Sequence, residues 1–184
     1  MRNYYHQQLS QLNEELIRMG AACEEIIGLA AQALTDHSRS LEEKTQQVGA
    51  AIDESERTIE NICLKLLLRQ QPVARDLRQI SAAMKMITDM ERIGDQAEDI
   101  VDLIPKMTRA AGEDGQMLTK MAQAAKNMVT EAVDAYVKQD LQLAGKVIGD
   151  DDIVDDYFNA VKTGIIQLIA QNPAEGEYAL DLLM

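Results

Sequence analysis

The chain has 184 residues, 46% of them hydrophobic, and its 31 acidic and 18 basic residues give a formal net charge of −13. This apolar content is enough for a buried core, which excludes a disordered chain, and the negative charge excludes a nucleic-acid partner, because phosphate backbones are bound by surfaces rich in Lys and Arg. Aromatic residues make up only 3%, while the residues that favour helices are plentiful, so we expect an all-α protein.

The first half of the chain predicts three long helices. Apolar residues between positions 9 and 33 recur at steps of three and four, which is the spacing of a helix with one buried face. Ser40-Leu-Glu-Glu43 has the pattern of a capping box that opens a second helix, which ends near Pro72. A third helix is expected from about Pro72 to Arg109, with Gly94 on its inner face, where its small size favours a close approach of two helices.

The second half predicts three more helices. Residues 111–115, Ala-Gly-Glu-Asp-Gly, give the clearest domain boundary, so we expect one domain over 1–110 and a second over 111–184. A fourth helix follows this break, and a fifth begins near Leu141. Asn172 and Pro173 are expected to open the sixth helix, with Asn172 as its cap.

The two halves of the sequence resemble an internal repeat of one three-helix unit. The second helix ends at Gln-Gln-Pro72 and the fifth at Gln-Asn-Pro173, and each proline is followed by an apolar periodic segment. The prediction is therefore two tandem three-helix bundles related by a pseudo-two-fold repeat, with the sixth helix truncated at Met184. Val154, Phe158 and Val161 should then be partly uncovered, which predicts a dimer or higher oligomer and a second bundle less ordered than the first.

Carboxylates are concentrated on one face of the predicted third helix. Glu91, Asp95, Asp99 and Asp102 fall within about 80° of arc, and like charges one turn apart are unfavourable unless they are neutralised. Asp53 lies as many residues before Pro72 as Glu91 lies after it, so an antiparallel pairing of the two helices brings them level to within about one turn. Glu56 and Glu60 therefore also come within range of the same face of the third helix.

Ligands that are all oxygens suit hard cations such as magnesium, calcium, manganese or ferric iron. The alternative is a solvated acidic face partly neutralised by Arg92 and Lys85. Asp151 and Asp155, on the predicted fifth helix, form a further pair one turn apart.

No window of about 18 uninterrupted apolar residues is present and the first residues are polar, so we expect a cytoplasmic protein without membrane insertion. Cys23 and Cys63 lie within apolar helical patterns and are expected to be buried thiols. The sequence has no Gly-rich phosphate loop, no Glu-x-x-His pair and no serine triad, which argues against an enzyme such as a metal-assisted hydrolase. A purely structural, dimerising bundle is the other alternative.

Two segments carry a family resemblance that extends over nearly the whole chain. Residues 69–78, Arg-Gln-Gln-Pro-Val-Ala-Arg-Asp-Leu-Arg, followed by Glu-Arg-Ile-Gly-Asp at 91–95, resemble the signature of the PhoU family of phosphate-uptake regulators. The resemblance implies two tandem three-helix bundles, often as a homodimer. It also implies a negative regulator without catalytic activity that couples the phosphate ABC transporter and its ATPase to a phosphate-sensing histidine kinase.

Some members of that family bind iron or zinc clusters through Glu/Asp-x-x-x-Asp motifs; magnesium or manganese is also compatible with such ligands. Carried onto this chain, the motifs fall on Glu91 with Asp95 and on Asp151 with Asp155. From the positions of the acids themselves, we expect Asp53 or Asp99 to complete the first set. The chain departs from the pattern at Gly49, where the family has an acid four residues before Asp53. A second Glu-Arg-Ile-Gly-Asp is also absent before Met184.

Overall fold

The structure is a computed structural model that describes residues 2–36, 38–70, 74–106 and 112–183. These residues form six α-helices and two short 3₁₀ segments, and no strand occurs among them, so the expected all-α class is confirmed. In chain order the helices are α1 (Arg2–Ala33), α2 (Arg39–Gln70), α3 (Ala74–Leu103), α4 (Gly112–Lys138), α5 (Leu141–Gln171) and α6 (Gly176–Leu183), with 3₁₀ segments at Ile104–Lys106 and Pro173–Glu175.

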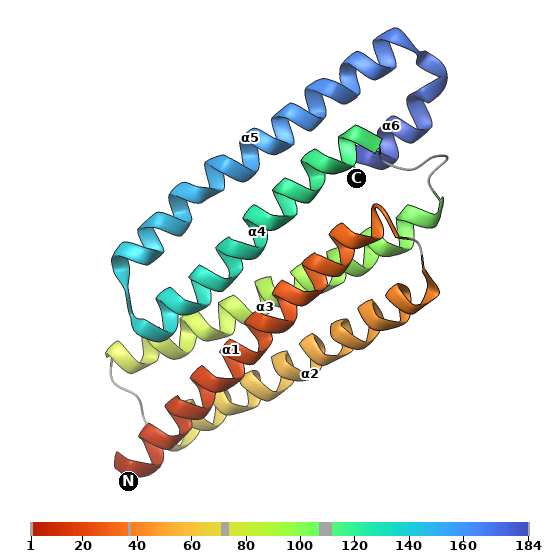
Figure 1. Ribbon diagram of the computed structural model, residues 1–184. Helices are drawn as coiled ribbons and strands as arrows, with labels where there is room; N and C mark the ends of the chain where they lie inside the picture. The colour runs from red at the N-terminus through yellow and green to blue at the C-terminus, as the bar shows by residue number, and fades with distance from the viewer. Residues whose placement is uncertain (1, 37, 71–73, 107–111, 184) are drawn as a thin grey trace.

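The first three helices form an antiparallel bundle in which each contacts the other two (Figure 1). Its core contains the residues of α1 that recur at steps of three and four, as the sequence predicts, among them Leu12, Leu16, Met19 and Ile26, all fully buried. Cys23 and Cys63 are buried in the same core. The core therefore accounts for the long apolar repeats of the first half of the chain.

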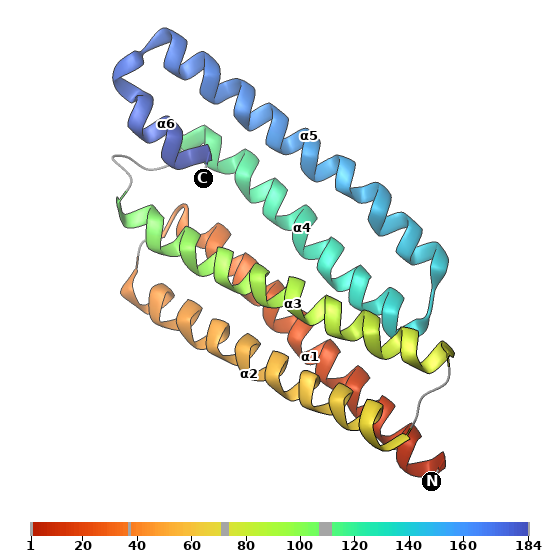
Figure 2. The ribbon, with the colours of Figure 1, turned by 180° about the vertical axis from the view of Figure 1, so that it is seen from behind.

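Helices α4 and α5 form a hairpin that lies beside this bundle, with α4 against α1 (Figure 2). Gly20 on α1 makes the close contact, because a Cβ atom there would lie 3.0 Å from Val133 Cγ2 on α4. Val133 is thereby part of the first core. At the tight turn of the hairpin, Gln139 adopts a positive φ of 54°, and the Asp140 side chain caps α5 by accepting hydrogen bonds from the amides of Gln142 and Leu143.

A second, smaller core lies at the other end of the hairpin. Tyr178, Ala179 and Leu182 of α6 pack against Val161 and Ile165 of α5. Helix α6 has only eight residues, so it covers one end of the hairpin, as Figure 1 shows. Of the three side chains expected to be partly uncovered, Phe158 is 41% exposed and Val154 is half-buried. Val161 is buried by α6, which corrects the expectation for that residue.

Three predictions at helix ends are wrong. Helix α2 begins at Arg39, so Ser40 lies within its first turn, and Glu43 pairs with Arg39 Nε at 3.1 Å instead of closing a capping box. Gly112–Gly115 belong to α4, so the expected break over 111–115 does not include them. Asn172 precedes a 3₁₀ turn and its side chain forms no capping hydrogen bond. The predicted turn at Pro72 lies outside the described residues.

None of the helices described is both long and apolar enough to cross a membrane.

Candidate metal centre

The candidate site lies at a close contact between α2 and α3. Gly94 is buried on α3, and a Cβ atom there would lie 3.2 Å from Ile52 Cδ1 on α2. The absence of a side chain at Gly94 thus allows Ile52 to pack directly on the α3 backbone. Asp53 follows Ile52, so this contact brings its carboxylate beside the side chains that flank Gly94 on α3.

Three carboxylates meet at this point. Asp53, Glu91 and Asp95 each contribute one carboxylate oxygen to a group whose atoms all lie within 4.8 Å of one another. Asp53 and Glu91 are half-buried and Asp95 is exposed. We call these three residues the carboxylate cluster. The structure brings together the two helices at the register that equal distance from Pro72 predicts.

The cluster is electrostatically crowded. Burial raises the pKa of Glu91, and the negative charges of Asp95, Glu56 and Asp53 raise it further. Of the ion pairs between described residues, one reaches the cluster, from Arg57 to Asp53 at 3.9 Å. Arg92, which the sequence offered as a neutralising group, pairs with Asp89 instead, at 3.8 Å. Such a group of carboxylates favours the uptake of a proton or a cation.

Glu98 is a fourth carboxylate that the sequence analysis missed. A Cβ atom at Gly49 would collide with the Glu98 carboxylate, so this side chain extends over α2 at Gly49. Burial raises the pKa of Glu98, followed by the charges of Asp95 and Asp53. Gly49 is the sequence feature that could have indicated Glu98, because a glycine leaves room for a carboxylate from the facing helix.

The chemistry of these donors fits a hard cation. One ion can contact oxygens that lie within about 4–5 Å of one another, each about 2.0–2.6 Å from it, and the three carboxylate oxygens of the cluster lie within 4.8 Å of one another. The thiols do not contribute: burial raises the pKa of Cys23 to about 12 and that of Cys63 to about 11. The Cys23 thiol instead donates a hydrogen bond to the Met90 carbonyl.

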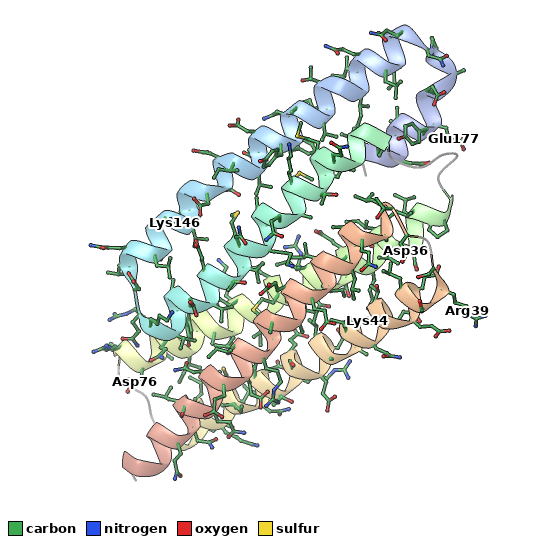
Figure 3. All side chains as sticks on the ribbon, in the orientation of Figure 1. Asp36, Arg39, Lys44, Asp76, Lys146 and Glu177 are labelled. Atoms are coloured by element: carbon green, nitrogen blue, oxygen red, sulfur yellow. The ribbon has the colours of Figure 1, made fainter. Side chains whose placement is uncertain are left out.

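The remaining predicted ligands do not join the cluster. Asp99 and Asp102 are exposed further along α3. Asp151 and Asp155 are exposed on α5 and belong to no group of three potential ligands among the described residues. Their neighbour Asp150 is engaged by Lys146 at 2.6 Å, and the same ammonium group contacts Glu131 of α4; Figure 3 shows Lys146 near the α4–α5 turn.

Comparison with known proteins assigns the fold and the signature to one family. A family model described as "PhoU domain" matches residues 16–104 and 118–184, which is most of the chain. The chain belongs to the PhoU domain family. The two matched segments correspond to the α1–α3 bundle and to the part formed by α4, α5 and α6. The carboxylate cluster lies wholly within the first PhoU match.

Relatives and solved structures agree with this assignment. A phosphate-specific transport system accessory protein PhoU homolog from Clostridium acetobutylicum is 31% identical over 95% of this chain and 80% of its own length, and one from Aquifex aeolicus is 30% identical with the same coverage. The crystal structure of PhoU from Pseudomonas aeruginosa superposes with a TM-score of 0.89 at 26% identity, over 97% of this chain and 87% of that one. A PhoU structure from Streptococcus pneumoniae, at 22% identity and a TM-score of 0.82, shares the fold.

Proposed function

We propose that this protein is a negative regulator of phosphate uptake and of phosphate-starvation signalling. It acts as a cytoplasmic, homodimeric adaptor between the phosphate ABC transporter, through its ATPase, and a phosphate-sensing histidine kinase. The observation that carries the proposal is the match to PhoU relatives along both halves of the chain, since these relatives are named as accessory proteins of phosphate-specific transport systems.

The proposed action is binding and not catalysis. The cluster supplies only carboxylates, and the raised pKa values of Cys23 and Cys63 keep both buried thiols protonated at neutral pH, so neither is an activated nucleophile. A regulator of this kind exerts its effect through the surfaces that it presents to its partners.

We further propose that the carboxylate cluster binds a hard cation, with Asp53, Glu91 and Asp95 as ligands and Glu98 as an additional donor. A bound cation would neutralise the repulsion that raises the pKa of Glu91. Asp99 lies outside the cluster, and Asp151 with Asp155 would need further ligands to form a second site.

The regulatory proposal is tested in a bacterium whose own PhoU gene is deleted and which carries a reporter of the phosphate-starvation response. Expression of this chain should restore repression of the reporter in phosphate-rich medium, and the chain should co-purify with the transporter ATPase. The Ile59→Asp variant, which places a charge in the core, is the negative control. It shows the reporter level that is reached when no functional regulator is present. A folded, abundant chain that leaves the reporter active would refute the proposal.

A further inference from the structure

A polar pocket lies between α1 and α4, which pack side by side (Figure 1). Its volume is about 350 Å³, and its lining comes from α1, the turn after it, and α4: Gly28, Ala31, Gln32, Thr35, Thr119, Ala122, Gln123 and Lys126. Two amides, two hydroxyls and one ammonium group thus line it together with three small residues. None of these lining residues is acidic, although the chain has 31 acidic residues. The pocket wall therefore offers hydrogen-bond donors and one positive charge.

Lys126 is unusual because its charge is shielded from water and weakly paired. Its side chain is 23% exposed, whereas the other basic side chains that form ion pairs between described residues are 53–89% exposed. Its Nζ lies 3.8 Å from a carboxylate oxygen of Glu24, which is beyond hydrogen-bond distance. A shielded ammonium group needs acceptor atoms for its N–H groups. Lys126 therefore has donors left for an acceptor in the pocket.

Gly28 makes room for this ammonium group. A Cβ atom at Gly28 would lie 3.4 Å from Lys126 Nζ, so the Lys126 side chain extends from α4 to the backbone of α1. The absence of a side chain at Gly28 thus leaves the ammonium group at the pocket wall, open to a ligand. A large residue at this position would occupy the space beside the charge.

Two glutamine amides can join Lys126 in binding a ligand. Gln32 Nε2 donates to Asp36 at 3.5 Å, at the end of α1 where Figure 3 labels Asp36. Gln123 Nε2 donates to Asn127 at 3.0 Å. Both contacts join exposed side chains one turn apart, where water competes for each partner, so the two amides are free to turn toward a ligand at little cost.

We propose that this pocket binds a small oxyanion, which accepts hydrogen bonds from Lys126, Gln32 and Gln123. Charge-assisted hydrogen bonds from an ammonium group to an oxyanion are stronger than those between neutral groups, so Lys126 supplies the main attraction. Glu24 opposes it, since its carboxylate lies beside the same ammonium group. The choice of inorganic phosphate as the anion rests on the proposed function; the pocket itself is lined by α1 and α4 and is separate from the carboxylate cluster on α2 and α3.

The test titrates the purified protein with inorganic phosphate and follows its backbone amides by nuclear magnetic resonance. A chelator keeps the carboxylate cluster free of metal, and chloride replaces phosphate at equal ionic strength in the reference titration. We expect saturable shifts at the amides of Gly28, Gln32 and Gln123, which line the pocket. Chloride should not produce them.

Matched variants separate the charge of the pocket from its shape. Lys126→Met keeps the length of the side chain and should weaken binding about tenfold or more, whereas Lys120→Met, exposed on α4 outside the pocket, should not. Glu24→Gln should strengthen binding about threefold, because it removes the negative charge beside Lys126. Gly28→Leu should abolish binding by filling the pocket. Far-ultraviolet circular dichroism verifies that each variant is folded.

Several outcomes would overturn the proposal. These are the absence of saturable shifts, the same shifts with chloride, or equal affinity of Lys126→Met and the parent chain. Shifts confined to Asp53, Glu91 and Asp95 would assign the anion to the carboxylate cluster instead. The titration needs no reporter strain. A chain that represses the reporter but binds no phosphate would leave the regulatory proposal standing, and one that binds phosphate without repressing would leave the oxyanion site standing.

Discussion

Glu91 reaches the carboxylates of Asp53 and Asp95 from the middle of α3, and burial together with these neighbours raises its pKa above the ordinary value of 4.5. For an acid whose pKa is raised by folding, the folded state binds protons more tightly than the unfolded state. The stability of the metal-free protein therefore falls as the pH rises from the ordinary Glu value through the higher folded value. At neutral pH the ionised Glu91 destabilises the metal-free fold.

Removing this charge should stabilise the metal-free protein. We expect Glu91→Gln to raise the melting temperature at neutral pH by about 1–2 °C, since like charges one turn apart cost a few tenths of a kcal/mol each. The difference should shrink as the pH is lowered toward the ordinary Glu value, and thermal melts across this range in the presence of a chelator measure it. Glu54→Gln, an exposed residue outside the cluster, is the control. A Gln variant less stable than the parent at neutral pH would contradict the argument.

Metal binding should depend on the individual cluster residues. Asp95→Asn replaces one ligand oxygen by an amide nitrogen with little change in size, so we expect cation affinity to fall roughly tenfold or more. Asp102→Asn, further along the same stripe and outside the cluster, should leave it unchanged. Elemental analysis of protein purified without chelator and calorimetric titration give the comparison. Unchanged metal content in a folded Asp95→Asn protein would show that the cluster is not the site.

At the scale of whole helices, the α2–α3 contact depends on two glycines with different neighbours. A Cβ atom at Gly94 would press on Ile52, which is 1% exposed in the core. A Cβ atom at Gly49 would meet the end of the Glu98 side chain, which can rotate away. The two positions therefore respond in opposite directions to a larger residue.

Gly49→Ala should stabilise the protein by about 0.5–1 kcal/mol, because alanine favours a helix interior over glycine. Gly94→Leu should destabilise it by about 1–3 kcal/mol, since the larger side chain overpacks the contact with Ile52. This second change should also move Asp53 away from Glu91 and weaken cation binding. Urea unfolding gives both free energies. Equal effects of the two substitutions would show that the helix approach does not depend on Gly94.

The helices and their pairing could be read from the sequence, while the rotation of one helix against another could not. Apolar residues spaced three and four apart predict α1 and its buried face. The equal sequence distances of Asp53 and Glu91 from Pro72 predict that these two residues lie side by side. Glu98 was missed because its approach to Gly49 depends on how α3 is rotated against α2. The capping box predicted at Ser40 is not formed, because the amides of Leu41 and Glu42 donate hydrogen bonds to the Ser38 carbonyl. Helix α2 therefore starts at Arg39, two residues before the start that a cap at Ser40 implies.

Across the whole molecule, burial is uneven. Helix α1 contributes a continuous row of fully buried residues to the first core, whereas only Val161 and Ile165 are buried along the 31 residues of α5. Helix α4 lies between these extremes, since Val133 belongs to the core of the first unit. The division into domains 1–110 and 111–184 remains a prediction, and the packing of α4 on α1 makes the second unit depend on the first.

This unevenness predicts the order in which parts of the protein open. Segments with few buried apolar contacts open at lower free energy than the core, so the amides of α5 and α6 should exchange with solvent deuterium faster than those of α1. Val161→Asp, which removes a member of the second core, should accelerate exchange in α5 and α6 and leave α1–α3 unchanged. Hydrogen exchange followed by mass spectrometry resolves these segments. Equal protection of α5 and α1 in the parent chain, or accelerated exchange throughout the variant, would mean that the two units open together as one cooperative body.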